Sequence, residues 1–511
     1  MRAKRKNVCL TCRSRKLAVS SKASQEALGL VCDGKQPTCS QCLVRKVPSC
    51  IYQQKFTFVY QGPSQTPTNT GLKDGNKVIP RTREMMPNIS PGRDQNIWNV
   101  EMSGLDILYR LGAQLKLRED CGFEDNIECI LQSYTHVKSP TPAEFDPFHN
   151  QICGAWIGVL SLLSASGRTK PFLLSAIGTF ATTLRHRSGR NESGQSLVSQ
   201  MYFDSLRRMG KALEDARGAF RFEHCVAIMC LAVTDILTPM LGSSWMTHVR
   251  GVGDLMKHLT PVAFSSGIFH LLFVGFRPLL LISSIVNRQA TFLAKEEWTT
   301  APFRGQPVSI MQQLLNQASV LPSLLERYYN MNSLLEITNL VAMERLCQDF
   351  QKFLGDLREW ELMSESSAPY PLVWSRPIPG NPLPLIGNIL WFPNMMTANS
   401  LTHYWAFMII ATTHLSTLNR AIATLKDHPS YIVSHSETER LVADLAGMIC
   451  NSMEYPTQPD MGLHHAGSSF FTLPTAIGVF QNDPARYNLQ LSRCRQIVEK
   501  MESLGVYFIN L

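Results

Sequence analysis

Apolar side chains recur at helical spacing along most of the chain from about residue 100 onward. Two runs show apolar residues alternately three and four positions apart: Leu340, Met343, Cys347, Phe350, Leu354 and Leu357, and then Met408, Ala411, Leu415, Leu418, Ile422 and Leu425. Further apolar residues widen the first stripe, namely Val341, Leu346, Phe353 and Trp360. Broad stripes are typical of helices buried inside a domain, whereas a coiled coil has a narrow seam. Because alternating strand patterns are nearly absent, the sequence predicts an all-α body.

Two segments interrupt the helical pattern. Residues 56–98 are dominated by Gly, Pro, Ser, Thr and Asn without apolar periodicity, which predicts a flexible linker. Pro369 to Pro384 holds six prolines and predicts a second loop between helices. The chain therefore divides into a head at 1–55, a linker at 56–98 and a helical domain at 99–511.

One apolar stretch is long enough to be compared with a membrane span. Phe269 to Ile285 carries Arg277 and Pro278, so we interpret it as a pair of buried helices and expect no membrane partner. The positively charged N-terminus is not followed by an apolar core, so we do not expect a secretory signal. A non-secreted chain is expected in a reducing compartment.

Charge and cysteine are concentrated in the head. The whole chain has a net charge of +9, while residues 1–55 hold twelve Lys and Arg against two acidic residues, a net charge of +10. The remainder is thus close to neutral, and the basic head is expected to meet a polyanion. Six of the fourteen cysteines also lie in the head. We expect the other eight to be buried free thiols.

The six head cysteines have the spacing of metal ligands: Cys9, Cys12, Cys32, Cys39, Cys42 and Cys50. Two of the pairs have the form Cys-x2-Cys, which lets both sulfurs reach one tetrahedral ion. Six thiolates complete two four-ligand zinc sites only if two of them bridge both ions. The alternatives are one four-cysteine zinc with two spectator thiols, or a disulfide knot, which a reducing compartment disfavours.

The residues between these cysteines carry a resemblance. Cys9-Leu-Thr-Cys12-Arg-Ser-Arg-Lys, followed by Cys32-Asp-Gly-Lys-Gln-Pro-Thr-Cys39-Ser-Gln-Cys42, resembles the fungal zinc binuclear cluster transcription factors. The resemblance covers about fifty residues and implies two zinc ions. It also implies that Cys9 and Cys39 bridge, that Cys12 and Cys32 complete one ion, and that Cys42 and Cys50 complete the other.

The basic run after the second cysteine suggests how the head would bind double-stranded DNA. A helix beginning near Cys12 would present its first turn to the major groove, where Arg15 and Lys16 can donate to guanine O6 and N7. Arg13 is expected on a phosphate. The resemblance implies that Arg15 and Lys16 read a CGG triplet, and that the chain is a nuclear regulator of RNA polymerase II genes. The segment Arg2–Lys6 fits a nuclear import signal, further phosphate contacts, or both.

The head departs from the family pattern in one respect. The family has six residues between the second and third cysteines, whereas this chain has nineteen, and Val31 stands where a basic residue is usual. The extra segment, Ala18–Leu30, is either a genuine loop or the translation of an unremoved intron. An alternative function follows: a helical regulatory or interaction protein whose interrupted head no longer binds DNA.

Residues of the body carry a second resemblance. Trp245-x2-His248-Val-Arg-Gly251 and Arg288-x3-Phe292-Leu293-x4-Trp298 resemble the fungal-specific regulatory region, or middle homology region, that follows such zinc clusters. We expect Trp245 to be a packing aromatic and His248 a hydrogen-bonded histidine near a helix start.

Catalytic motifs and a dimerisation helix are both missing from the sequence. No phosphate-binding Gly-rich loop, Gly-x-Ser-x-Gly or His-Glu-x-x-His occurs, and His464-His465 lacks a third ligand, so we predict no enzyme. A homodimer is not supported, because Leu108, Leu111 and Leu115 make only a single heptad.

Overall fold

Helices account for most of the chain that the structure describes. This computed structural model describes residues 122–134, 156–166, 170–186, 192–216, 221–238, 244–331, 336–376, 389–426, 432–458, 467–504 and 506. The predicted all-α class is confirmed for these residues, which include one pair of short strands. The predicted head, at 1–55, and linker, at 56–98, lie outside them.

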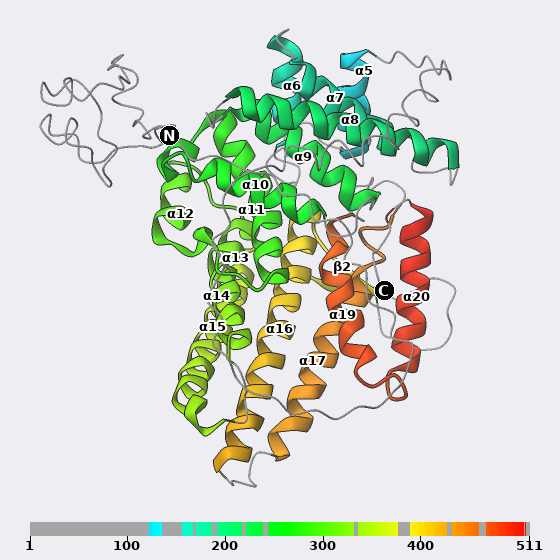
Figure 1. Cartoon of the computed structure of the whole chain (residues 1–511). Coiled ribbons are helices and arrows are strands. Elements are labelled where there is room, and N and C mark those ends of the chain that lie inside the picture. The colour runs from blue at the N-terminus through cyan, green and yellow to red at the C-terminus, as the bar shows by residue number, and fades with distance from the viewer. Residues whose placement is uncertain are drawn as a thin grey trace, which may run out of the picture.

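The first helices form a layer across one end of the body. They are α5 (Phe123–Tyr134), α6 (Ile157–Ser166), α7 (Pro171–His186) and α8 (Glu192–Ala216). In Figure 1 this layer, coloured cyan to green, lies above the longer helices. Helix α7 packs against α5, α8 and the next helix, α9 (Phe222–Leu237), and so joins the layer to the rest of the body.

The middle of the chain forms shorter helices and turns. These are α10 (Ser244–Met256), η1 (Pro261–Phe264), α11 (Gly267–Val286), η2 (Phe292–Ala294), α12 (Glu296–Thr300), η3 (Ala301–Phe303), α13 (Ile310–Ala318), α14 (Leu321–Tyr329) and η4 (Ile337–Asn339). Helix α13 begins where the Ser309 hydroxyl accepts a hydrogen bond from the Gln312 backbone N–H at 3.4 Å, a side-chain cap of a helix N-terminus.

The remaining helices are α15 (Leu340–Ser367), α16 (Met395–Lys426), α17 (Ile432–Ser452), η7 (Ser468–Phe470), α19 (Thr472–Gln481) and α20 (Asn488–Ser503). Helices α15, α16 and α17 run lengthwise through the body, with α16 packed against both of the others. Helix α20 lies at the edge, packed on α19 and α17.

The two stripes predicted from apolar spacing lie on α15 and α16. On α15 the residues from Met343 to Trp360 at helical spacing are buried, but Val341 is 76% exposed. The prediction that Val341 widens the stripe is wrong, because it lies in the first turn of the helix, on the solvent side. On α16 every residue from Met395 to Ile409 is buried, so this half of the helix is surrounded by protein.

Polar residues inside α16 are accommodated by the helix itself. The Ser400 hydroxyl donates to the Met396 carbonyl at 2.7 Å, and the Thr402 hydroxyl donates to the Ala398 carbonyl at 2.9 Å. Because each hydroxyl bonds the carbonyl four residues earlier, it needs no partner from another helix. The stripe pattern alone would place these positions on a solvent face.

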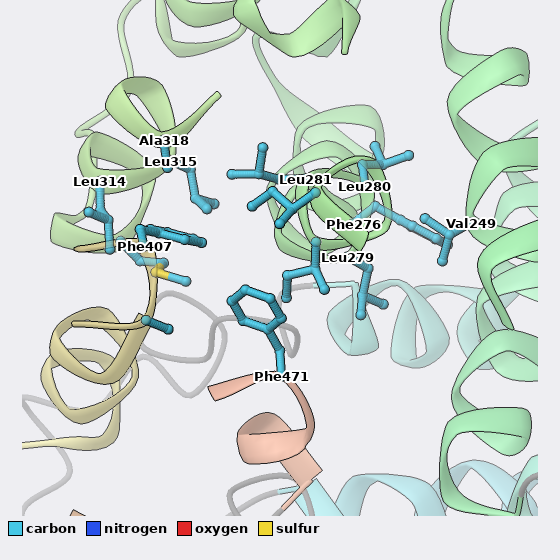
Figure 2. Packing of buried hydrophobic residues seen from close by; sticks show 14 of the residues in the cluster. Val249, Phe276, Leu279, Leu280, Leu281, Leu314, Leu315, Ala318, Phe407 and Phe471 are labelled. Carbon is cyan, nitrogen blue, oxygen red and sulfur yellow. The ribbon is translucent and has the colours of Figure 1, made fainter. Parts of the chain in front are cut away.

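The apolar segment at Phe269–Ile285 is one helix, α11, and the predicted helix pair is wrong. Pro278 lies inside it without ending it. Its length and composition would allow α11 to span a membrane, yet 67% of its most apolar window is buried in the body. Figure 2 shows side chains of α11 at the centre of the core, where Leu281 points toward α13 and Phe276 toward Val249 of α10.

The predicted proline loop contains a short strand. β1 (Trp374–Arg376) pairs antiparallel with β2 (Ile389–Trp391), and Trp374 lies opposite Trp391. The Arg376 guanidinium lies 4.7 Å from the centre of the Trp391 ring, a cation–π contact that holds the two strands together. The loop does end α15 as predicted, since α15 stops at Ser367.

Candidate functional site

The predicted metal and DNA contacts all precede the residues that the structure describes. They are Cys9, Cys12, Cys32, Cys39, Cys42 and Cys50 for zinc, and Arg13, Arg15 and Lys16 for DNA. Their roles therefore stay predictions. His464 and His465 also lie outside the described residues. Across the described part of the chain, no group of three or more His, Cys, Asp or Glu side chains could hold a metal ion.

The first motif of the body lies on α10. The His248 Nε2 atom and the Tyr202 hydroxyl of α8 form a 2.7 Å hydrogen bond, and both side chains are buried. Burial lowers the pKa of His248 to about 4, so the imidazole is neutral at physiological pH. Trp245 packs edge-to-face on Phe470, with ring centres 5.4 Å apart. Both predictions are confirmed: Trp245 packs and His248 is hydrogen-bonded.

A glycine allows α10 to approach α11 closely. A Cβ atom at Gly253 would lie 2.9 Å from the Leu280 Cδ2 atom, a distance that real Cβ contacts do not reach. The side chain of Leu280 therefore fills the space above Gly253. This contact fixes the distance between the helix that carries Trp245 and His248 and the central helix of the core.

The second motif surrounds the end of α11. Arg288, the residue two positions past the helix, has a left-handed backbone with φ 55. Its guanidinium lies 3.7 Å from the centre of the Tyr329 ring on α14, and the Tyr329 hydroxyl lies 3.2 Å from His414 Nε2 on α16. Arg288 thus contacts Tyr329 through a cation–π contact, and Tyr329 is hydrogen-bonded to His414. Together these two contacts link α11, α14 and α16.

Phe292 and Trp298 of the same motif form an aromatic cluster. Their ring centres are 4.7 Å apart in an edge-to-face arrangement. Trp298 also packs against Phe264 and Phe273, at 5.6 and 5.8 Å. The cluster joins α12 to α11 and η1, so the second motif, like the first, holds helices together.

The centre of α11 contains a buried cation, Arg277, whose role the sequence did not reveal. The side chain is fully buried, and burial lowers its pKa to about 9. One terminal nitrogen donates to the Gln312 side-chain oxygen at 3.0 Å and to the Gln312 backbone carbonyl at 3.2 Å, and the other donates to Asn316 Oδ1. The guanidinium also lies 5.2 Å from the Phe303 ring centre.

Gln312 also explains why α11 continues through Pro278. Proline has no N–H, so it leaves the carbonyl of Val274, four residues earlier, without its helical partner. The Gln312 Nε2 atom donates to that carbonyl at 3.1 Å. One amide side chain therefore accepts from the buried guanidinium of Arg277 and donates to the carbonyl that Pro278 leaves free.

Other buried titratable groups also serve to join helices. The Tyr404 hydroxyl of α16 donates to Glu361 Oε2 of α15 at 2.7 Å, and burial raises the pKa of both groups. His403 bonds the Asn399 carbonyl at 2.8 Å and has a pKa lowered to about 4 by burial. The bond between Tyr404 and Glu361 thus joins α16 to α15, and the His403 bond lies within α16.

Comparisons with known proteins do not assign a family or a function to this chain. No model of a known protein family matches the chain, and no solved structure matches it. A segment of 148 residues, 29% of this chain, is 24% identical to an uncharacterized protein of Emericella nidulans. That segment spans 31% of the Emericella protein. The similarity covers less than a third of either chain and carries no statement about activity.

Proposed function

We propose that this protein is a sequence-specific DNA-binding regulator of transcription by RNA polymerase II. In this proposal it acts in the nucleus, the N-terminal head folds around two zinc ions and reads CGG-type half-sites, and the helical body regulates the head. The observation that carries the proposal is the six-cysteine pattern with a basic run directly after the second cysteine.

The chemistry of the donor set fits two zinc ions. Zinc prefers four tetrahedral ligands and binds thiolate sulfur well. Four singly bound and two bridging thiolates supply the eight zinc–sulfur bonds that two ions need. Six thiolates and two zinc ions together carry a charge of −2, which the excess of +10 in residues 1–55 offsets while leaving positive charge for phosphates. In the family arrangement, Cys9 and Cys39 bridge the ions.

Zinc in this module would supply folding free energy. Structural zinc sites contribute about 10–16 kcal/mol in small modules. The protein's own residues would then read DNA, because Arg15 and Lys16 match the positions that donate to guanine in the major groove. Arg13 would position the head on a phosphate.

The helical body supports a regulatory role for the rest of the chain. The residues after 55 have a net charge of −1, so the basic charge available for DNA belongs to the head. The helix that carries the first motif packs closely on α11 at Gly253, and the second motif holds neighbouring helices against α11 through Arg288 and Trp298. In this proposal the body regulates the head and is not a second DNA-binding element.

The long spacing between Cys12 and Cys32 favours a second candidate function. Lengthening that loop from six to nineteen residues costs only about 1 kcal/mol in closure entropy, so zinc binding would survive. The recognition helix would lose the metal-bound cysteine that normally follows it closely. The second candidate is therefore a helical regulatory or interaction protein with a zinc head that does not bind DNA.

DNA binding by the full-length protein tests the first proposal against the second. Fluorescence anisotropy would compare a duplex with CGG half-sites and one with those bases scrambled. We expect Arg15→Ala and Lys16→Ala each to reduce the preference for the CGG duplex by about 1–3 kcal/mol. The matched control, Lys6→Ala, should weaken binding to both duplexes alike. Equal binding of wild-type protein to the two duplexes would refute sequence-specific reading and favour the second candidate.

A further inference from the structure

Two cysteines far apart in the sequence face each other inside the body. Cys450 lies near the end of α17 and Cys494 lies in the first half of α20, and their sulfur atoms are 3.4 Å apart. Both are free thiols, and Cys450 and Cys494 are 6% and 2% exposed. The prediction that the scattered cysteines are buried free thiols is confirmed for these two and for Cys225, Cys230 and Cys347, while Cys129 is half-buried.

The register between α17 and α20 is fixed by neighbouring ion pairs. Glu454, one turn after Cys450, accepts from Lys500 at 2.6 Å, and Arg493 lies 3.7 Å from the other oxygen of the same carboxylate. Arg493 and Lys500 stand on either side of Cys494 along α20. These ion pairs lie beside the two sulfurs, which are 3.4 Å apart. A movement of about 1.4 Å would bring the sulfurs to disulfide bonding distance.

We propose that Cys450 and Cys494 form a thiol pair that a peroxide converts reversibly into a disulfide, locking α20 onto α17. One thiol first loses its proton, and the resulting thiolate attacks one oxygen of hydrogen peroxide. The O–O bond breaks, the sulfur becomes a sulfenic acid, and the leaving hydroxide takes up the proton lost by the thiol to form one water. The second thiol then attacks the sulfenic sulfur, the S–S bond forms and a second water leaves. In sum, two thiols are oxidised and one peroxide is reduced to two waters.

Cys494 is the sulfur that reacts first. The hydrogen bond between the two sulfurs and the nearby Arg493 guanidinium lower the pKa of Cys494, whereas the same hydrogen bond and burial raise the pKa of Cys450. Cys494 also lies on the helix that opens more easily. The described core residues of α20 are three, Cys494, Ile497 and Met501, and the helix lies at the edge of the body in Figure 1. A small oxidant can reach the pair when α20 moves outward.

Other buried cysteines provide an internal control. Cys225 and Cys230 lie on α9 and are fully buried, and burial raises the pKa of both thiols. Cys347 bonds Asn419 Oδ1 at 3.4 Å instead of another sulfur. If oxidation merely followed the presence of a thiol, these residues would react as readily as Cys450 and Cys494.

The experiment treats the folded full-length protein with a few equivalents of hydrogen peroxide. The protein is then denatured, alkylated with iodoacetamide, digested and examined by mass spectrometry. The expected result is a cross-linked peptide that joins Cys450 to Cys494 and is lost on adding dithiothreitol. Cys225 and Cys230 should remain fully alkylated. The variant Cys494→Ser should lose the cross-link, and the control Cys347→Ser should keep it.

Limited proteolysis adds a second measurement that does not depend on a variant. Trypsin cleavage after Arg495 in α20 should slow after oxidation of the wild-type protein and recover after reduction. The proposal is overturned if native protein yields no Cys450–Cys494 peptide, if the peptide arises only after denaturation, or if Cys225 and Cys230 lose their thiols equally fast.

Discussion

The side chain of Gln312 offers the most exacting test of how the core is held together. Gln312→Leu keeps a side chain of similar size but removes both polar atoms of the amide. Arg277 then loses one hydrogen bond to its buried guanidinium, and the Val274 carbonyl loses its donor. The matched control is Gln317→Leu, the same substitution on an exposed position of the same helix.

The expected cost follows from these two lost partners. A hydrogen bond to a charged group contributes about 1.5–3 kcal/mol, and an unsatisfied buried carbonyl costs about 1–3 kcal/mol. Burial of the apolar leucine side chain offsets this loss of stability by about 1 kcal/mol. We therefore expect Gln312→Leu to reduce the free energy of unfolding by about 3 kcal/mol, and Gln317→Leu to change it by less than about 0.5 kcal/mol.

A double-mutant cycle isolates the role of Pro278. Pro278→Ala restores a backbone N–H that can bond the Val274 carbonyl, so that carbonyl no longer needs Gln312. In that background Gln312→Leu should cost at least about 1 kcal/mol less than in the wild type. Urea titrations followed by far-ultraviolet circular dichroism measure the four proteins of the cycle and the Gln317→Leu control. The reasoning is refuted if the cost of Gln312→Leu equals that of Gln317→Leu, or if it is the same with and without Pro278.

Three further predictions concern zinc, the inserted segment and pH. Replacing Cys9 or Cys39 by serine should lower the zinc content of the full-length protein below two ions per chain. The loss should be larger than for serine at any other head cysteine, since each of these two would bridge both ions. Elemental analysis that finds at most one zinc in wild-type protein contradicts this. Deleting Ala18–Leu30 should leave the zinc content unchanged and tighten binding to a CGG duplex by about tenfold. The reason is that a metal-bound cysteine would again follow the recognition helix closely. Equal affinity of the deleted and the wild-type protein at matched salt would contradict this. Stability should fall as pH drops from about 6.5 towards 4, because His248 and His403, with folded pKa values of about 4, bind fewer protons than their unfolded forms. At ~pH 5 each histidine should lower the free energy of unfolding by about 2 kcal/mol. His248→Gln should therefore flatten the pH dependence of the urea midpoint. An unchanged pH dependence would show that His248 is not its source.

Local pattern was enough to predict the long helices. The apolar spacing between Met343 and Leu357 defines α15, and that between Met408 and Ile422 lies on α16, because burial of one helix face is a local property of the chain. Local pattern was not enough where a contact between distant segments determines the structure. The sequence predicts a break between two helices at Pro278, but Gln312, far along the chain, supplies the missing donor.

In the candidate site, too, the sequence predicts local features but not the contacts between distant segments. The sequence predicted that Trp245 packs and that His248 is hydrogen-bonded, but the partner Tyr202 lies 46 residues earlier, on another helix. The pairing of Cys450 with Cys494 spans 44 residues and has no sequence signature. A cysteine cluster, by contrast, can be predicted from the sequence, since its ligands include closely spaced Cys-x2-Cys pairs.

In the proposed function, the cysteine head makes this protein a sequence-specific DNA reader. Selection of bound duplexes from random DNA tests it most directly, with full-length protein in zinc-containing buffer and Cys39→Ser as the paired sample. The account predicts that wild-type protein enriches CGG-type half-sites and that Cys39→Ser enriches none. Selection that recovers no common sequence with wild-type protein, or the same sequence with Cys39→Ser, would contradict it.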